Sequence, residues 1–290
     1  MEEAKTRREF LKDTALISAA MAAMRAVDGV QAAEAAPGKL PKIHLGKLEV
    51  SRLILGSNPF FGFSHKPDDT DKQQREYYTE ERIMAVMDEA ADQGITAVWT
   101  PCYDHWIKLW NKYQEKGGKL RIWIGQPDAA PEKMKDHITA AAKNGAKAIC
   151  IQGEACDRQF KENKHDVVRG WLEHIRSFGL PAGMGSHKPE THLIAEDRKF
   201  PTDFYHQCFF QPEDYSLELR DKAVATIQKL EKTVVGYKIL AAGRLPAVEA
   251  FTFAFKHIRP KDGVCVGVFP KLKADQIAEN AALALKLSAL

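Results

Sequence analysis

Polar side chains follow directly on several apolar runs of this 290-residue chain, and the densest group is the triplet Tyr103-Asp104-His105. A phenol, a carboxylate and an imidazole can each donate or accept a proton, so the triplet could take part in acid–base chemistry or bind a substrate. Asp104 and His105 could equally cap the helix that follows. The triplet by itself therefore leaves open which of its members is functional.

Glu154 and His187 form a second candidate pair. Glu154 ends an apolar run, where a carboxylate without a partner, a metal or water is costly. His187 precedes Lys188-Pro189-Glu190, which is typical of a helix start, so it could also be only a cap. If the two runs are adjacent strands, the side chains lie within about 5–7 Å of each other, close enough to act as acid and base or to share a divalent metal.

The ends of the other apolar runs supply further polar and aromatic candidates. We expect substrate contacts from Asn58, Asp104, His105, Gln126, Gln152 and Phe210, and a positive charge in the site from Lys238. The side chains expected to be catalytic are Tyr103, Glu154, His187 and Lys238. This concentration of polar residues after apolar runs favours an enzyme over a purely structural protein.

Eight apolar runs alternate with segments of helical periodicity, and this pattern predicts a (β/α)8 TIM barrel as one domain over residues 40–290. Strands of such a barrel are hydrophobic throughout because both faces are covered, and the working face lies at their carboxyl ends. Helices are expected over residues 79–94, 131–145, 166–179 and 216–231, and a hairpin turning at Gly46-Lys47 is expected to close the bottom. The strand runs are residues 52–58, 95–101, 121–127, 146–154, 180–187, 203–210, 233–240 and 263–270.

Six motifs, in the same order along the chain, resemble those of the aldo-keto reductase superfamily over roughly residues 42–285. LGKLEVSRLILGSNPFFG resembles the family's hairpin and first strand, and GITAVWTPCYDH stands where that family carries its catalytic Asp and Tyr. AGMGSHKPETH, DFYHQCFF and VVGYKILAAGRL resemble its fifth, sixth and seventh strands, and KLKADQIAENAALAL resembles its closing segment.

The resemblance implies an NAD(P)-linked enzyme in which Tyr103 is the proton donor. It assigns Ser186, Gln207 and Phe210 to the nicotinamide, and Lys271, Lys273, Gln276 and Asn280 to the adenosine end. The rest of the family's catalytic set is replaced: Trp99 or Thr100 stands for the Asp, Gly125 or Gln126 for the Lys, and Gln152 or its neighbour for the His.

The first 36 residues resemble a twin-arginine (Tat) export signal. Thr6-Arg7-Arg8-Glu9-Phe10-Leu11-Lys12 precedes a weakly apolar stretch and a small-residue step at Ala33-Glu34-Ala35. The stretch is shorter than the about 20 apolar residues that cross a bilayer, so no stable membrane span is expected. We therefore predict an exported, periplasmic protein that meets the Tat translocase during export.

Composition narrows the function further. The chain has 42 basic and 39 acidic residues and no basic run interleaved with aromatics, so we expect a small-molecule substrate and no nucleic acid. The five cysteines, without a C-x-x-C pair, do not describe a disulfide framework.

Three functions remain open at this stage. The first is an NAD(P)-linked oxidoreductase acting on a carbonyl or polyhydroxylated small molecule. The second is a non-redox enzyme on a carbohydrate, an isomerase, epimerase, lyase or hydrolase that uses a divalent metal at Glu154 and His187 or acid–base catalysis. The third is a catalytically inactive binding barrel.

Overall fold

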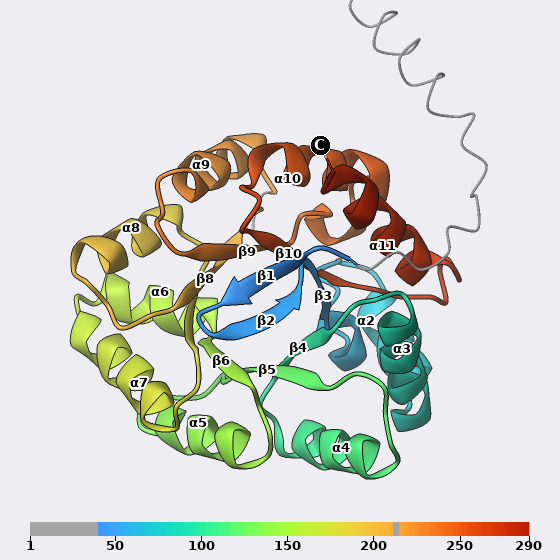
Figure 1. Cartoon of the computed structure of the whole chain (residues 1–290), viewed down its shortest axis with the longest axis horizontal. Coiled ribbons are helices and arrows are strands. Elements are labelled where there is room, and N and C mark those ends of the chain that lie inside the picture. The colour runs from blue at the N-terminus through green and yellow to red at the C-terminus, as the bar shows by residue number, and fades with distance from the viewer. Residues whose placement is uncertain (1–39, 211–214, 290) are drawn as a thin grey trace, which may run out of the picture. The chain divides into compact units, whose positions relative to one another are not determined.

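A computed structural model of the chain describes residues 40–210 and 215–289, and its centre is a closed barrel of eight parallel strands. Each strand pairs with the next along the chain and the last returns to the first, as Figure 1 shows. The prediction of a TIM barrel is confirmed, and each strand falls inside one predicted apolar run. The strands are β3 (Leu53–Gly56), β4 (Ala97–Pro101), β5 (Ile122–Gln126), β6 (Ala148–Ile151), β7 (Ala182–Ser186), β8 (Phe204–Cys208), β9 (Thr233–Tyr237) and β10 (Gly263–Gly267).

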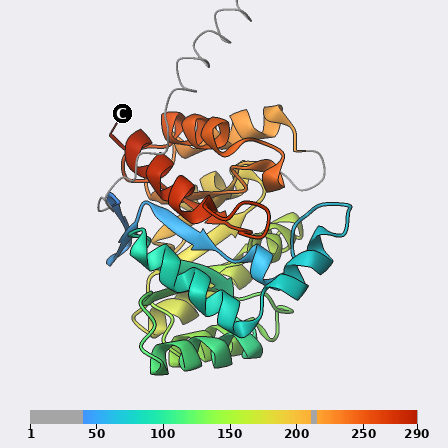
Figure 2. The ribbon, with the colours of Figure 1, turned by 90° about the vertical axis from the view of Figure 1, so that its right-hand side faces the viewer.

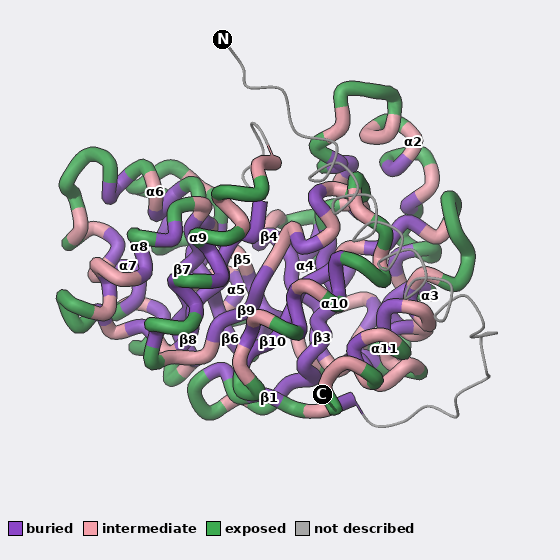
Figure 3. The backbone as a smooth tube through the Cα atoms, turned by 90° about the horizontal axis from the view of Figure 1, so that it is seen from above, coloured by how far each residue is buried: buried purple, intermediate pink, exposed green. Residues whose placement is uncertain are grey.

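The strands are buried on both faces, which explains why their sequences are apolar throughout. One face fills the barrel interior with side chains such as Ile54, Trp99 and Phe204. The other face packs under the surrounding helices. Figure 3 shows this arrangement, with strands largely in the colour of buried residues and exposed segments mostly in the outer helices and loops.

Helices α3 (Glu80–Asp92), α5 (Met134–Lys143), α7 (His165–Ser177) and α9 (Leu217–Ile227) correspond to the four predicted from periodicity. The side-chain oxygens of Thr79 and Ser216 accept hydrogen bonds from backbone N–H groups in the first turns of α3 and α9, which fixes where those helices begin. The other helices are α2 (Thr70–Tyr77), α4 (Asp104–Glu115), α6 (Gly153–Lys161), α8 (Pro189–Asp197), α10 (Ala247–His257) and α11 (Gln276–Leu287), with 3-10 turns η1 (Asn58–Phe61) and η2 (Ala241–Gly243).

The predicted hairpin is also confirmed. Strands β1 (Lys42–Leu45) and β2 (Leu48–Ser51) pair antiparallel, and Gly46 adopts a φ of 59° in the turn, a conformation that suits glycine. Ile43, Leu45 and Val50 bury their side chains against the interior cluster of the barrel. Figure 2 shows the hairpin, in dark blue, at one end of the barrel and the loop leading to α2 at the other. The hairpin closes the bottom and leaves the opposite face for a site.

The predicted Tat signal, residues 1–36, lies outside the described residues. Among the helices of residues 40–210 and 215–289, none is long and apolar enough to cross a membrane. All five cysteines are buried and free, which agrees with the absence of a disulfide framework.

Candidate active site

A cavity of about 920 Å³ opens at the carboxyl ends of the barrel strands, on the face where TIM barrels carry their active sites. The loops after most of the strands contribute to its wall. The segments that follow successive strands contribute, in chain order, Asn58, Tyr103, Asp128, Glu154, His187, Lys238 and Phe269.

The most completely assembled polar group of the cavity wall is centred on Asp157, a residue of α6. Its Oδ2 accepts hydrogen bonds from the backbone N–H of His187, at 2.9 Å, and from Nδ1 of the same residue, at 3.0 Å. Its Oδ1 accepts a hydrogen bond from the Ser186 hydroxyl. The carboxylate side chain is 12% exposed and the imidazole 22% exposed, so this is a largely desolvated pair that fixes the orientation of His187.

The backbone at Gly185 allows this contact. A Cβ at Gly185 would come 2.9 Å from the carbonyl oxygen of Ile151 and 3.0 Å from the amide nitrogen of Gly153. The first turn of α6 therefore sits directly against the end of β7. This close approach brings Asp157 within hydrogen-bonding distance of the residues that end that strand.

The floor of the cavity is a stack of three rings. The His206 ring lies between Trp99, at a centroid distance of 4.0 Å, and Tyr237, at 4.1 Å. Burial lowers the pKa of His206 well below its usual value, and the neighbouring His192, His187 and Lys238 act in the same direction. His206 is therefore neutral, and within the described residues its Nε2 and the Trp99 Nε1 are buried without a hydrogen-bond partner.

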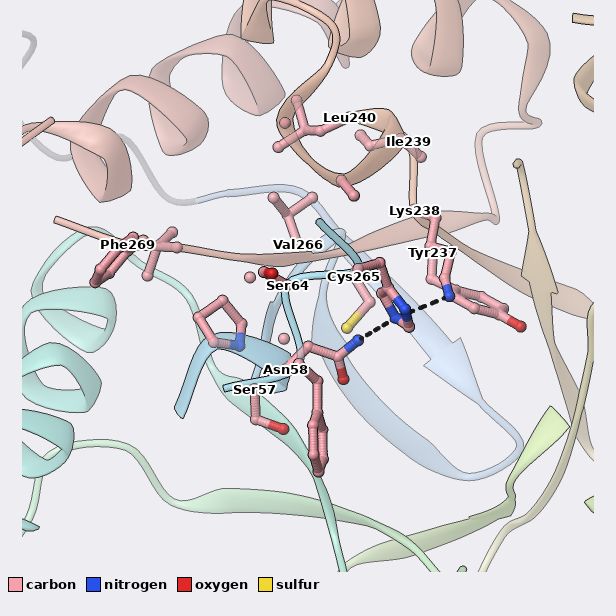
Figure 4. A pocket seen from close by; sticks show the side chains of 18 of the residues that line it. Ser57, Asn58, Ser64, Tyr237, Lys238, Ile239, Leu240, Cys265, Val266 and Phe269 are labelled. Atoms are coloured by element: carbon pink, nitrogen blue, oxygen red, sulfur yellow. Dashed lines mark hydrogen bonds between the residues drawn. The ribbon is translucent and has the colours of Figure 1, made fainter. Parts of the chain in front are cut away.

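A second polar group joins the loops after β3 and β9. The His65 Nε2 lies 3.1 Å from the Lys238 Nζ and 3.5 Å from the Asn58 Nδ2, as the dashed lines of Figure 4 show. Burial and the charge of Lys238 lower the pKa of His65 to about 4, so the neutral imidazole accepts a hydrogen bond from the ammonium group. His65 and Lys238 both have positive φ, 56° and 57°, a conformation rare for residues with a side chain. The loops thus hold Lys238 in a defined position at the cavity.

Tyr103 also lines the cavity, but its environment differs from that of an activated proton donor. Its hydroxyl donates to the Asp128 carboxylate at 3.4 Å, and burial together with Asp128 raises its pKa to about 12. Tyr103 therefore stays protonated at neutral pH. Asp104 begins α4, and His105 stacks on the Tyr103 ring at 5.5 Å, but neither of these two lines the cavity, where we expected substrate contacts from both.

Two predicted glutamines do reach the cavity. Gln126 ends β5 and lines the wall. Gln152 lines it as well, but its side-chain oxygen caps α6 by accepting a hydrogen bond from the Ala155 N–H at 2.9 Å. Gln126, unlike Gln152, caps none of the described helices.

Glu154 lines the cavity from the first turn of α6, but its side chain is 68% exposed and forms an ion pair with Arg158 at 3.3 Å. The expected cost of a buried carboxylate therefore does not arise, because the strand ends at Ile151 and Glu154 belongs to the helix. Throughout residues 40–210 and 215–289, no three His, Cys, Asp or Glu side chains are arranged to hold a metal ion. The proposed metal pair, Glu154 and His187, has no third such ligand there.

The three residues assigned by resemblance to a nicotinamide do not line the cavity. The Ser186 hydroxyl donates to Asp157, and Phe210 is buried, 2% exposed. Gln207 is fully buried, with its oxygen 2.8 Å from the His192 Nδ1 and its amide nitrogen donating to the Cys208 carbonyl. These side chains therefore do not fit the contacts that a nicotinamide amide would need.

The residues assigned to the adenosine end divide in two. Lys273, Gln276 and Asn280 line the cavity, whereas Lys271 is exposed outside it. The Lys273 ammonium lies 2.7 Å from the Glu279 carboxylate, and the Gln276 oxygen accepts a hydrogen bond from the Phe269 N–H at 2.6 Å. The lysine charge that could meet a phosphate is thus neutralised within the chain.

Sequence reasoning missed Asp157, His206, Tyr237 and His65. Asp157 lies in the first turns of a helix that directly follows β6, and that position alone brings it to the working face. His206 lies two residues after Phe204 in the same strand. Because Phe204 faces the interior, the two-residue period of a strand places His206 on the same face and could have identified it. Tyr237 was passed over for its neighbour Lys238.

The sequence matches no family model and no curated protein. Solved structures with a similar fold include two proteins from Pseudomonas aeruginosa that have been assigned to the aldo-keto reductases. One has 17% identity and a TM-score of 0.61, covering 88% of this chain and 99% of the other. The second has 20% identity and a TM-score of 0.55, covering 85% and 94%.

A truncated 3-deoxy-D-arabino-heptulosonate 7-phosphate synthase from Thermotoga maritima is also similar, with 12% identity, a TM-score of 0.52, and coverage of 87% of this chain and 92% of the other. At these identities the likeness shows the fold alone, a (β/α)8 barrel. The same barrel carries different chemistries in these proteins, so function has to be argued from the site.

Proposed function

We propose that this chain is an enzyme that transfers protons on a small hydroxylated carbonyl compound, with His187 as the general base and acid. The observation that carries the proposal is the Asp157–His187 pair at the cavity wall. This is the second of the three functions that the sequence left open, in its acid–base form.

The pair determines which nitrogen of His187 reacts. An ionised carboxylate only accepts hydrogen bonds, so the Nδ1 that lies 3.0 Å from Asp157 carries the hydrogen. Nε2 is then the nitrogen that takes a proton from the substrate and returns it. The Asp157 charge stabilises the imidazolium formed in between.

Lys238 supports the same chemistry from the loop after β9. Removing a proton from carbon next to a carbonyl group places negative charge on the carbonyl oxygen. An ammonium group at the cavity, oriented through His65, is suited to stabilise that charge. Together, a base and a cation at one cavity favour an isomerase, an epimerase or a lyase.

Hydride chemistry on NAD(P) is less well supported by the residues present. Ser186, Gln207 and Phe210 lie outside the cavity lining and are held by contacts within the chain. The proposed reaction therefore uses no dinucleotide. We further infer that the substrate is met outside the cytoplasm, because Thr6 to Lys12 resemble a twin-arginine signal.

Proton exchange in D₂O tests the proposal. The protein is incubated with a panel of aldoses, ketoses and keto-sugars, and deuterium at the carbon next to the carbonyl is followed by proton NMR. For a substrate that exchanges with the wild type, His187→Ala should lower the rate by about 100-fold or more. His44→Ala, which changes an exposed histidine of the hairpin, should exchange at the wild-type rate.

Two results would contradict the proposal. The first is exchange at the wild-type rate in His187→Ala. The second is a wild type that exchanges no proton with any member of the panel but reduces one of them with NADPH, measured as loss of nicotinamide absorbance in the same samples.

A further inference from the structure

Large apolar side chains that are exposed to solvent gather at the mouth of the cavity. In the described part of the chain five such residues stand out: Phe63 (42% exposed), Phe178 (37%), Leu217 (58%), Val248 (46%) and Leu272 (63%). Three of them, Phe63, Val248 and Leu272, line this one cavity, from the loop before α2, the first turn of α10 and the loop before α11. Exposed apolar groups gathered in this way mark a surface that binds something.

Below the mouth, the same side of the cavity continues as an apolar wall. Ile239 and Leu240 follow Lys238 in the loop after β9, and Val266 and Phe269 come from β10 and the loop after it. Figure 4 shows Ile239 and Leu240 near Lys238, with Val266 and Phe269 along β10 and the loop that follows it. The cavity is thus divided into a polar part near the reacting groups and an apolar part leading outward.

The charged groups around Leu272, in the loop after β10 and the start of α11, include a paired lysine. The Lys273 ammonium lies 2.7 Å from Glu279 and 3.9 Å from Asp275. Leu272, next to Lys273 in the sequence, is the exposed apolar residue of this loop that lines the cavity. This loop therefore offers a neighbouring molecule an apolar contact and a balanced ion pair, and not the net positive charge that a phosphate would need.

We propose that the apolar part binds the hydrocarbon tail of an amphipathic substrate whose hydroxylated head lies at His187. The position of the head rests on the proposed function, whereas the position of the tail follows from the apolar residues that line this side of the cavity. The size of the cavity, about 920 Å³, is near the upper end for drug-sized ligands and leaves room for more than a polar head. The tail would occupy the side where the family resemblance assigns the adenosine end of a dinucleotide.

A chain-length series measures the tail site independently of catalysis. n-Alkyl glucosides from butyl to octyl, each below its critical micelle concentration, are titrated into the full-length protein by calorimetry. Burial of each added methylene should tighten binding about three- to fourfold while the tail stays inside the cavity. The readout is the slope of affinity against chain length.

Charge placed in the apolar part should flatten that slope. Leu272→Glu and Val248→Glu alter exposed residues of the lining, so both should fold, and each should reduce the gain per methylene to less than twofold. Leu217→Glu is the matched control, because it places the same charge on an equally exposed leucine outside the cavity, and its slope should equal that of the wild type.

The inference is overturned if affinity in the wild type does not change with chain length, or if Leu272→Glu and Leu217→Glu give the same slope. It is also overturned if the wild type is a dimer that Leu272→Glu dissociates while the slope is flat, since the apolar mouth would then be a contact between copies. NADPH that binds tightly and is lost in Leu272→Glu would assign the surface to a dinucleotide. His187→Ala should leave the slope intact, so failure of the proton-transfer proposal and failure of the tail site are separate results.

Discussion

The Asp157–His187 pair gives the sharpest test, and replacing Asp157 by Asn is the perturbation. The carboxylate accepts two hydrogen bonds from His187 and one from Ser186. Asn keeps one oxygen for the His187 donors but presents an amide N–H₂ group to Ser186. The Ser186 hydroxyl can instead donate to the Lys188 carbonyl, 2.9 Å away, so this third contact is rearranged and not simply lost.

The cost of Asp157→Asn is then mainly the loss of charge from the two His187 bonds. Hydrogen bonds to charged groups contribute about 1.5–3 kcal/mol and neutral ones about 0.5–1.5 kcal/mol, a difference of about 1–1.5 kcal/mol for each bond. We expect a destabilisation of about 2–3 kcal/mol. For a domain of this size that lowers the melting temperature by about 5–10 °C.

Differential scanning calorimetry of the purified variants provides the measurement. Asp128→Asn is the control, because Asp128 is exposed and, among residues 40–210 and 215–289, accepts only the 3.4 Å bond from Tyr103. The cost of this substitution should stay within about 0.5 kcal/mol. Asp157→Ala should be less stable than Asp157→Asn, since it removes the acceptor of both His187 donors. If Asp157→Asn melts at the wild-type temperature, the carboxylate does not hold His187 and the argument for the active site is refuted.

Three further predictions concern other parts of the chain. Burial lowers the pKa of His192 from its ordinary 6.5 to about 4, so the unfolded chain binds more protons than the folded chain between these pH values, and stability falls as the pH falls through that window. His192→Asn should therefore lose less stability than the wild type between about pH 7 and about pH 4, measured by urea titration. Gly183→Ala should destabilise the protein by about 1–3 kcal/mol, because a Cβ there would lie 2.3 Å from a buried phenylalanine ring. Gly170→Ala, which has open space around it in α7, should stabilise the protein by about 0.5–1 kcal/mol. Thermal melts should therefore show a lower melting temperature for the first variant and a higher one for the second. Replacing Arg7 and Arg8 together by Lys should leave the protein in the cytoplasmic fraction of an exporting host, and unchanged periplasmic yield would contradict a twin-arginine signal.

The sequence by itself determined the barrel. Eight apolar runs, each closed by polar residues and separated by helical periods, specify strands buried on both faces, and all eight are found where the runs predict them. Gly46 marked the hairpin turn, and the position of the working face followed from the topology. These features depend on residue type and local spacing, which a sequence contains.

The tertiary structure decided which polar residues meet. Asp157 and His187 are thirty residues apart and come together only because Gly185 lets α6 sit against β7. The pleat of β8 turns His206 inward, where it lines the cavity, while Gln207 is bonded within the chain and lies outside the lining. Glu154, expected at a strand end, is carried into solvent because the helix begins one residue earlier. Side-chain partnerships of this kind depend on distances between elements, which periodicity and composition do not encode.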